Sequence, residues 1–153
     1  MKSTVGLLPS ITNITNNIVA ISYQGDYDDG YIETIRITIN DTSKTFKNIF
    51  SKAGSYAIKG NKTVFTATLT TTSGDKTLSL PVHPGWNYLV LTYDHAYIKF
   101  FNNLTNVSLV CSDNIVSSST RVIFGGFRGV YDEFALYKTH LRDDEIYDHF
   151  TQY

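Results

Sequence analysis

Hydrophobic and polar residues alternate with a period of two along most of the chain. In residues 31–39 isoleucines alternate with threonine and arginine, and in residues 63–72 apolar side chains alternate with threonines. Successive side chains of a β-strand point to opposite faces, so each segment predicts a strand with one buried and one solvated face. Such segments recur, between clusters of turn-forming residues, at the spacing of a β-sandwich or barrel. The predicted strands cover residues 18–23, 31–39, 45–51, 55–59, 63–72, 76–80, 86–93, 97–101, 106–111, 122–124 and 130–137.

The pattern changes after the last of these strands. Ile146 and Phe150 are four residues apart, with Leu141 shortly before them, which is the spacing of one helix face. Residues 143–145 are all acidic, and negative charge is favourable at a helix N-terminus. The sequence therefore predicts a short helix at 143–150 that covers one end of the sandwich.

A glycine-rich turn is predicted just before the last strand. Gly125, Gly126 and Gly129 lie between two apolar segments, and glycine favours the positive φ of a tight or bulged turn. Asp132 follows closely, and we expect its carboxylate to brace the turn by accepting hydrogen bonds from turn amides.

The composition is that of one β-rich globular domain. The chain has 153 residues, of which 42% are hydrophobic, 14% aromatic and 18% charged. We expect residues 1–17 to be an N-terminal arm or edge strand, and residues 18–153 to form an all-β domain, a two-sheet antiparallel jelly-roll sandwich with one short C-terminal helix. The single cysteine, Cys111, has apolar neighbours and is expected to be buried and unreactive. The predicted core includes Ile35, Ile37, Phe65, Leu69, Trp86, Leu89, Leu91 and Phe134.

The charge balance excludes some classes of partner. Lys and Arg number 13 against 14 Asp and Glu, a net charge of −1. Without an excess of cations to neutralise phosphates, neither nucleic acid nor an anionic membrane surface is an expected partner. Polar residues interrupt the apolar runs near the N-terminus, so neither a signal peptide nor membrane insertion is predicted. The chain is then either made in the cytosol or a piece cut from a longer protein.

Three motifs can be compared with known families. Tyr23-Gln24-Gly25 is similar to a Phe-Asp-Gly pattern, and residues 86–94 match a tryptophan followed by an apolar run that ends in Thr-Tyr-Asp. The tail matches a pattern of seven spaced positions: Gly129, Asp132, Glu133, Tyr137, Leu141, Glu145 and Ile146. Together the motifs resemble the concanavalin A-like lectin and glucanase superfamily, in its laminin G-like, pentraxin-like form. The resemblance implies a jelly roll and a role in binding rather than catalysis.

Two positions depart from the family pattern. Asn102-Asn103 stands where the family usually has an Asn-Gly turn, and Arg142 stands where it has a serine helix cap. Without the serine, Asp143 is a candidate cap for the helix.

The sequence offers little support for catalysis. A retaining glycosidase needs two carboxyl groups about 5 to 5.5 Å apart, which the glucanases of this fold place at alternating positions of one strand. The chain contains no Glu-x-Asp-x-Glu pattern, and its four histidines lack the spacing of zinc ligands. We therefore predict neither an enzyme nor a zinc site.

Candidate binding residues lie mainly in one acidic turn. Residues Asp26, Asp28 and Asp29 supply three carboxylates, which makes calcium the candidate ion, although solvated aspartates are also common in turns. Glycan binding needs aromatic faces beside polar groups, and Tyr27, Tyr31, Tyr56 and Tyr97 are expected at loops. The predicted ligand-binding residues are thus Asp26, Tyr27, Asp28, Asp29, Tyr31 and Tyr97.

These observations lead to one expected function, one alternative and one weaker option. We expect a non-catalytic binding module, a structural, decoration or fibre component on the surface of a virus or phage particle, with other protein subunits as partners and host glycans as candidate ligands. The alternative is a carbohydrate-binding or adhesive domain of a larger secreted protein, and a third, weaker option is a residual glycosidase. The location expected for the first two is the virion surface or the extracellular space.

Overall fold

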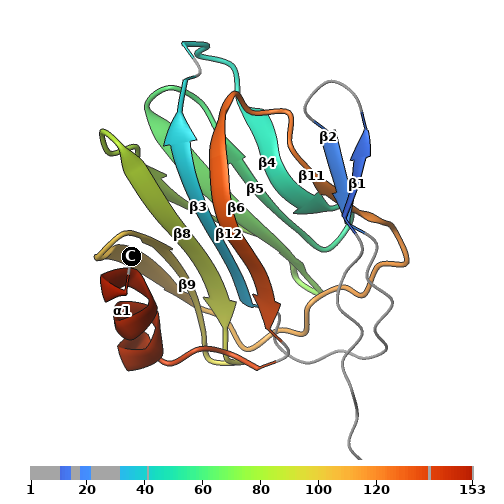
Figure 1. The fold of residues 1–153 in the computed structure, drawn as a ribbon. Coiled ribbons are helices and arrows are strands. Elements are labelled where there is room, and N and C mark those ends of the chain that lie inside the picture. The colour runs from blue at the N-terminus through green and yellow to red at the C-terminus, as the bar shows by residue number, and fades with distance from the viewer. Residues whose placement is uncertain (1–10, 15–17, 22–31, 41, 138, 153) are drawn as a thin grey trace, which may run out of the picture.

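The computed structural model describes residues 11–14, 18–21, 32–40, 42–137 and 139–152. Within these ranges the chain forms twelve strands and one helix, with the strands in two antiparallel sheets (Figure 1). The strands are β1 (Ile11–Ile14), β2 (Ile18–Ile21), β3 (Ile32–Ile39), β4 (Lys47–Lys52), β5 (Tyr56–Gly60), β6 (Val64–Thr71), β7 (Gly74–Pro81), β8 (Trp86–Tyr93), β9 (Tyr97–Asn102), β10 (Thr105–Val110), β11 (Val122–Phe124) and β12 (Gly129–Tyr137), and the helix is α1 (Asp143–Thr151). The predicted two-sheet antiparallel sandwich with a short C-terminal helix is confirmed.

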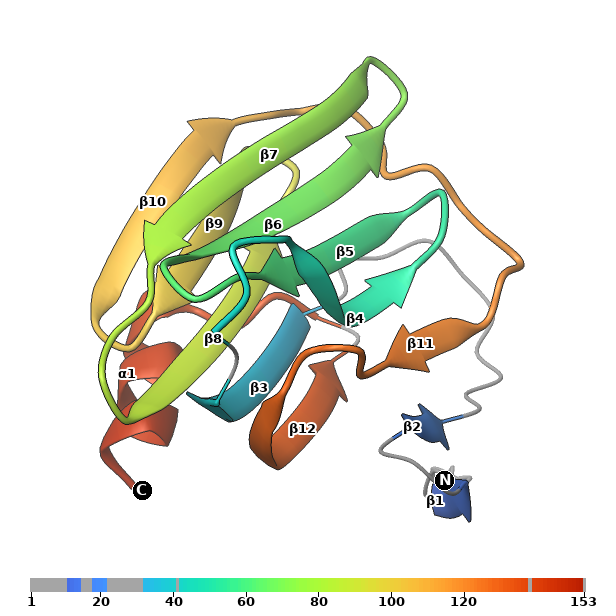
Figure 2. The ribbon, with the colours of Figure 1, turned by 90° about the horizontal axis from the view of Figure 1, so that it is seen from above.

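The order of strands in each sheet differs from their order in the chain. One sheet has seven strands in the order β1-β2-β11-β4-β5-β6-β7, and the other has five in the order β10-β9-β8-β3-β12. Figure 2 shows the two layers from above, with β12 beside β3 although about ninety residues separate them in sequence. This arrangement is a jelly-roll-like sandwich. β1 lies at one edge, but most of residues 1–17 lies outside the described ranges, so the division of the chain at residue 17 stays a prediction.

The main core lies between the two sheets. Ile35 and Ile37 of β3 and Leu89 of β8 are fully buried, and they share one cluster with Phe65 of β6 on the opposite sheet. Burial of such side chains stabilises the fold by about 1.5–3 kcal/mol each relative to exposure. Of the predicted core, Ile35, Ile37, Phe65, Leu69, Leu89 and Leu91 are buried and Phe134 packs against them partly buried. Cys111 is also buried, as expected.

Trp86 departs from the predicted core. Its side chain is 38% exposed, at the start of β8. Because Leu89 points into the core, the alternation along the strand directs Trp86 and Tyr88 to the outer face of the sheet. α1 covers Tyr88 but stops short of Trp86. The prediction relied on the apolar character of the whole strand and is wrong for its first residue.

The helix packs on the outer face of the five-stranded sheet, beside β8 and β9 (Figure 1). Ile146 is 2% exposed and forms a second, small core with Tyr88, Val90 and Phe101. Phe150 packs at the margin of this core, with its ring centroid 6.2 Å from that of Tyr88. The predicted helix is therefore confirmed, but its predicted place is wrong: it covers part of the outer face of the five-stranded sheet and not one end of the sandwich, because the side chains of Tyr88, Val90 and Phe101 leave an apolar surface on that face. In the part of the chain that the structure describes, no helix is long and apolar enough to cross a membrane.

The start of the helix differs from the expected cap. Arg142 is the N-cap residue, and its backbone N–H donates a hydrogen bond to Glu145 Oε2 at 2.8 Å. Asp143, the candidate cap, instead occupies the first helical position, where its Oδ1 lies 2.7 Å from Lys99 Nζ of β9. A negative charge at this position is favourable beside the helix N-terminus. The ion pair also ties the helix to the sheet.

The glycine turn before β12 forms as predicted. Gly125 and Gly126 have φ of 104° and 105°, which L side chains rarely adopt. A Cβ on Gly129 would lie 2.0 Å from the carbonyl oxygen of Thr38, so no larger residue fits there. Asp132 does not brace this turn: it lies opposite Arg36 in the sheet, with 4.0 Å between its Oδ2 and Arg36 Nη1.

Candidate binding site

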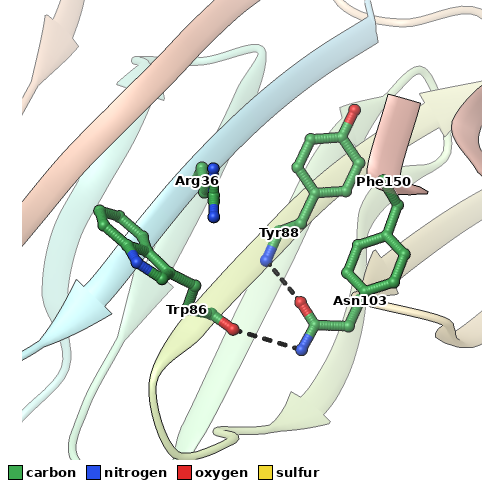
Figure 3. A pocket seen from close by; sticks show the side chains of 5 residues that line it. All are labelled: Arg36, Trp86, Tyr88, Asn103 and Phe150. Atoms are coloured by element: carbon green, nitrogen blue, oxygen red, sulfur yellow. Dashed lines mark hydrogen bonds between the residues drawn. The ribbon is translucent and has the colours of Figure 1, made fainter. Parts of the chain in front are cut away.

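A hollow of about 240 Å³ opens on the outer face of the five-stranded sheet, beside the C-terminal end of α1. It is lined by Arg36 of β3, Trp86 and Tyr88 of β8, Asn103 of the turn after β9, and Phe150 of α1 (Figure 3). Three of the five are aromatic, one is a cation and one is an amide. Such a mixture of aromatic surface and few polar groups is typical of small ligand sites.

The β-sheet and one asparagine hold the wall of the hollow in place. Asn103 has a φ of 55°, in the left-handed region that asparagine tolerates better than most residues. Its Oδ1 accepts a hydrogen bond from the Tyr88 backbone N–H at 2.8 Å, and its Nδ2 donates to the Trp86 carbonyl at 3.3 Å (Figure 3). The Asn103 backbone N–H also donates to the Tyr88 carbonyl, at 2.9 Å. Asn103 therefore fixes both β8 residues that line the hollow.

A stacked cation covers part of Trp86. The Cζ atom of Arg36 lies 4.8 Å from the centroid of the indole, a cation–π arrangement, and the Arg36 side chain is 19% exposed. Arg36 is the single charged residue among the five that line the hollow, and Asp132 lies beside it at 4.0 Å. The hollow thus combines an oriented aromatic ring with a positive charge.

Two fully buried asparagines support the site from inside the sandwich. Asn87 accepts a hydrogen bond from the His83 N–H and donates to the His83 carbonyl, both at 2.9 Å. Asn102 donates to Asn87 Oδ1 at 2.9 Å and to the Pro81 carbonyl at 2.8 Å. Asn87 follows Trp86 in the chain, and Asn102 precedes Asn103. The hydrogen bonds of the two buried asparagines therefore hold the backbone next to both residues of the hollow.

Most of the residues predicted from sequence as a site lie outside the described ranges. These are Asp26, Tyr27, Asp28, Asp29 and Tyr31, and the proposed calcium site among them stays a prediction. Tyr97 is described and is 45% exposed at the start of β9. It lines a second hollow, of about 190 Å³, at the N-terminal end of α1. Tyr56, also expected at a loop, is instead 5% exposed, because its ring stacks on Phe50 in the main core. No group of three or more metal-ligating side chains occurs among the described residues.

Sequence reasoning missed the residues of the first hollow. For Trp86 a signal was available, because the core positions Leu89 and Leu91 have the opposite parity along β8. For Arg36, Asn103 and Phe150 no local pattern could show that they meet, since three separate elements bring them together.

The hollow lacks the groups for glycoside hydrolysis. None of the five lining residues is a carboxylate, whereas a glycosidase normally needs a paired acid and base or nucleophile. Trp86, Phe150 and Asn103 can contact a ligand but belong to residue types that do not transfer protons in catalysis, and the phenol of Tyr88 is on a side chain only 5% exposed. The geometry therefore fits binding.

Comparison with known proteins finds similar folds but assigns no family. No protein-family model matches the sequence, and no curated protein sequence gives a significant match. Among solved structures, the binding domain of botulinum neurotoxin serotype D is similar over 93% of this chain, with a TM-score of 0.70 and 13% identity. The receptor-binding domain of botulinum neurotoxin D in a second structure has a TM-score of 0.69 at 13% identity, also over 93% of this chain. That of the C/D mosaic serotype has a TM-score of 0.67 at 12% identity, over 94% of this chain.

These similarities concern one part of the toxin domains. The match covers 41%, 43% and 45% of the three chains, so the present chain spans less than half the length of each. At such low identity the likeness shows a shared jelly-roll-like β-sandwich.

Proposed function

We propose that the protein is a non-catalytic binding module that holds a glycan against Trp86. The observation that carries this proposal is the fixed, 38% exposed indole beside Arg36 and Asn103 in a hollow of about 240 Å³. A sugar ring presents an apolar C–H face that packs on an aromatic side chain, while its hydroxyls need hydrogen-bonding groups at the rim. The rigid sheet and the Asn103 hydrogen bonds keep this surface ready for a ligand, which reduces the entropic cost of binding.

The similar folds agree with this proposal. Two solved structures similar to this chain are named as a binding domain and a receptor-binding domain of botulinum neurotoxin. The tail motif from Gly129 to Ile146 supports a place for the chain in the laminin G-like branch of the concanavalin A-like superfamily, which we include in the proposal. Extracellular or virion-surface exposure follows if the ligand is a host glycan.

The test is substitution of the indole. We expect Trp86→Ala to lower the affinity for glycans selected on a glycan array by about tenfold or more, because a buried aromatic contact often contributes over 1 kcal/mol. Phe46→Ala is the matched control: Phe46 is 45% exposed, lies away from the hollow, and should leave binding unchanged. Titration calorimetry measures both. Absence of any glycan binding by the intact protein, or equal affinity of the Trp86 variant, would overturn the proposal.

We also propose that the module is carried on a larger assembly, such as the surface of a virus or phage particle. The composition of strand β10 favours this role. β10 lies at the edge of its sheet and none of its six residues is charged. Leu109 is 38% exposed and Val110 is 74% exposed. Of the other three sheet edges, β7 carries the charged residues Asp75 and Lys76 and β12 has a bulge after Asp132, whereas β1 is also without charge. An uncharged edge fits a second copy of itself without like-charge repulsion.

Size measurement separates this role from the alternative. Light scattering after a sizing column should find dimers or larger species, and a lone monomer at high concentration would contradict pairing through β10. The alternative is a carbohydrate-binding or adhesive domain of a larger secreted protein. Virion genes beside the coding sequence would support the first role, and a longer secreted reading frame the second.

A further inference from the structure

The second hollow lies on the same outer face of the five-stranded sheet, at the opposite end of α1. Its volume is about 190 Å³. The lining residues come from β8, from β9 and from the segment that leads into the helix: Thr92, Asp94, Tyr97, Lys99, His140, Leu141, Arg142 and Asp143. This hollow is more polar than the first, because it contains one aromatic residue and two carboxylates rather than three aromatic residues and none.

Asp94 is held as a fixed acceptor in this hollow. Its Oδ1 accepts hydrogen bonds from the backbone N–H groups of Ala96 and Tyr97, at 2.9 and 2.6 Å, so the carboxylate cannot rotate freely. Within the described residues Oδ2 receives no hydrogen bond. Burial opposes ionisation of Asp94, but the two backbone hydrogen bonds and the nearby charges of His140 and Lys99 hold its pKa below the ordinary value. The group is therefore an ionised acceptor at neutral pH.

The cations of the hollow are largely neutralised by other partners. Lys99 Nζ donates to both oxygens of Asp143, at 2.7 and 2.9 Å. Arg142 Nη2 lies 3.3 Å from Asp144 Oδ2 and 3.6 Å from Glu145 Oε1. An anionic ligand would compete with these carboxylates. A neutral ligand that donates hydrogen bonds to Asp94 would disturb none of them.

Tyr97 supplies an apolar surface beside this acceptor. Its side chain is 45% exposed, and it pairs across the sheet with Val110, which is 74% exposed. An exposed tyrosine ring next to a fixed carboxylate can contact a sugar in two ways. The tyrosine ring packs on the C–H face of the sugar, and the carboxylate accepts hydrogen bonds from the sugar hydroxyls. A cation is less suited, because the described residues contain no group of three metal-ligating side chains.

We propose that this hollow is a second sugar-binding subsite, in which Asp94 accepts hydrogen bonds from the hydroxyls of a neutral sugar ring that packs on Tyr97. The inference rests on the proposed glycan-binding function and adds a second point of contact to it. Because α1 separates the two hollows, each binds its own sugar residue. The ligand is then a branched glycan or two glycans on one surface.

The experiment distinguishes the two hollows by where the signals change. The methyl glycosides of glucose, galactose, mannose and N-acetylglucosamine serve as probes, and amide chemical shifts are followed by NMR. We expect one set of shifts at Tyr88 and Asn103, and a separate set at Ala96 and Tyr97. Shifts at the first pair alone would overturn the second subsite and leave the proposed function intact. Shifts at neither pair would overturn both.

Variants then test the role of each group. Asp94→Asn retains a side-chain oxygen for the two turn amides, so the fold is kept while the negative charge is lost. We expect Asp94→Asn to lower the affinity obtained from the second set of shifts at least tenfold, and Tyr97→Ala to lower it by a similar factor. The affinity obtained from the first set should stay unchanged in both variants. Asp75→Asn, on the outer face of the other sheet, is the matched control and should change neither. Unchanged second-set affinity in both the Asp94 and the Tyr97 variants would contradict the subsite.

Discussion

The outer faces of the two sheets differ in the contacts that their polar side chains make. On the seven-stranded sheet a row of threonines along β6 pairs with its neighbours on β7: Thr68 Oγ1 lies 3.0 Å from Thr77 Oγ1, and Thr70 Oγ1 donates to Asp75 Oδ1 at 2.7 Å. These groups satisfy one another on a regular strand surface. Both hollows described above lie on the five-stranded sheet, where α1 is packed.

The helix creates the difference. It rests on Tyr88, Val90 and Phe101 and so stands above the sheet as a wall. A hollow forms at each of its ends, with Phe150 at the C-terminal end and Arg142 at the N-terminal end. The strands alone form a regular surface, and the packing of α1 on part of that surface produces the two hollows.

The largest expected effect comes from loosening the helix. Ile146 is 2% exposed in the small core beneath α1, and truncation of a buried isoleucine typically costs about 2–5 kcal/mol of unfolding free energy. We expect Ile146→Ala to lower stability by roughly this amount and to weaken glycan binding at both hollows. Urea unfolding and NMR titration measure the two effects.

The neighbouring helix position provides the control for this substitution. Tyr147 is 53% exposed, so Tyr147→Ala should change stability by no more than about 0.5 kcal/mol and leave binding as it is. If Ile146→Ala left both hollows fully active, the helix would not be the element that shapes them.

A smaller effect is expected from acid. The pKa of Asp94 is lowered in the folded protein, so its ionised form adds stability above the unfolded-state pKa of about 3.9, and this contribution is lost as pH falls through the lower folded-state pKa. Wild-type protein should therefore melt at a higher temperature than Asp94→Asn at neutral pH, and the gap should close in strong acid. Melting curves recorded from neutral to acidic pH measure this gap. A constant gap would mean that the Asp94 charge is not its cause.

The smallest effect is expected on the threonine face. Thr68→Val removes one hydroxyl of a solvated pair and keeps the shape of the side chain. We expect a change in stability within about 0.5 kcal/mol and no change in glycan binding, as for most surface substitutions. Thermal unfolding and the same glycan titration provide the check. Loss of glycan binding by Thr68→Val would indicate that the glycan binds on the seven-stranded sheet and not in the hollow at Trp86.

Local pattern was sufficient to predict most of the fold. The period of two placed the strands, because burial of one face imposes that alternation, and the change of spacing at Ile146 and Phe150 predicted the helix. The glycine turn was predictable because positive φ selects glycine at Gly125 and Gly126. The exposure of Trp86 was not predicted, because β8 is apolar throughout and the polar half of the alternation is missing. Its parity relative to Leu89 places Trp86 on the outer face, but the sequence does not show how far α1 covers that face.

The site was much less predictable than the fold. The first hollow joins Arg36, Trp86 and Phe150, which belong to three elements and meet only after β3 pairs with β8 and α1 docks. The spacing of residues along the chain does not indicate that these three side chains lie close together. Tyr97 was predicted as an exposed aromatic residue, and it is exposed at the second hollow; its role in binding stays a prediction. The position of the Asp94 carboxylate depends on hydrogen bonds to turn amides, which the sequence alone does not show.

The proposed glycan site is tested most directly by a crystal structure of the protein soaked with the glycan that binds best on an array. We expect a sugar ring packed against the Trp86 indole, within hydrogen-bonding distance of Arg36 or Asn103, on the outer face of the five-stranded sheet. A glycan bound instead along the threonines of β6, with the Trp86 hollow empty, would contradict it.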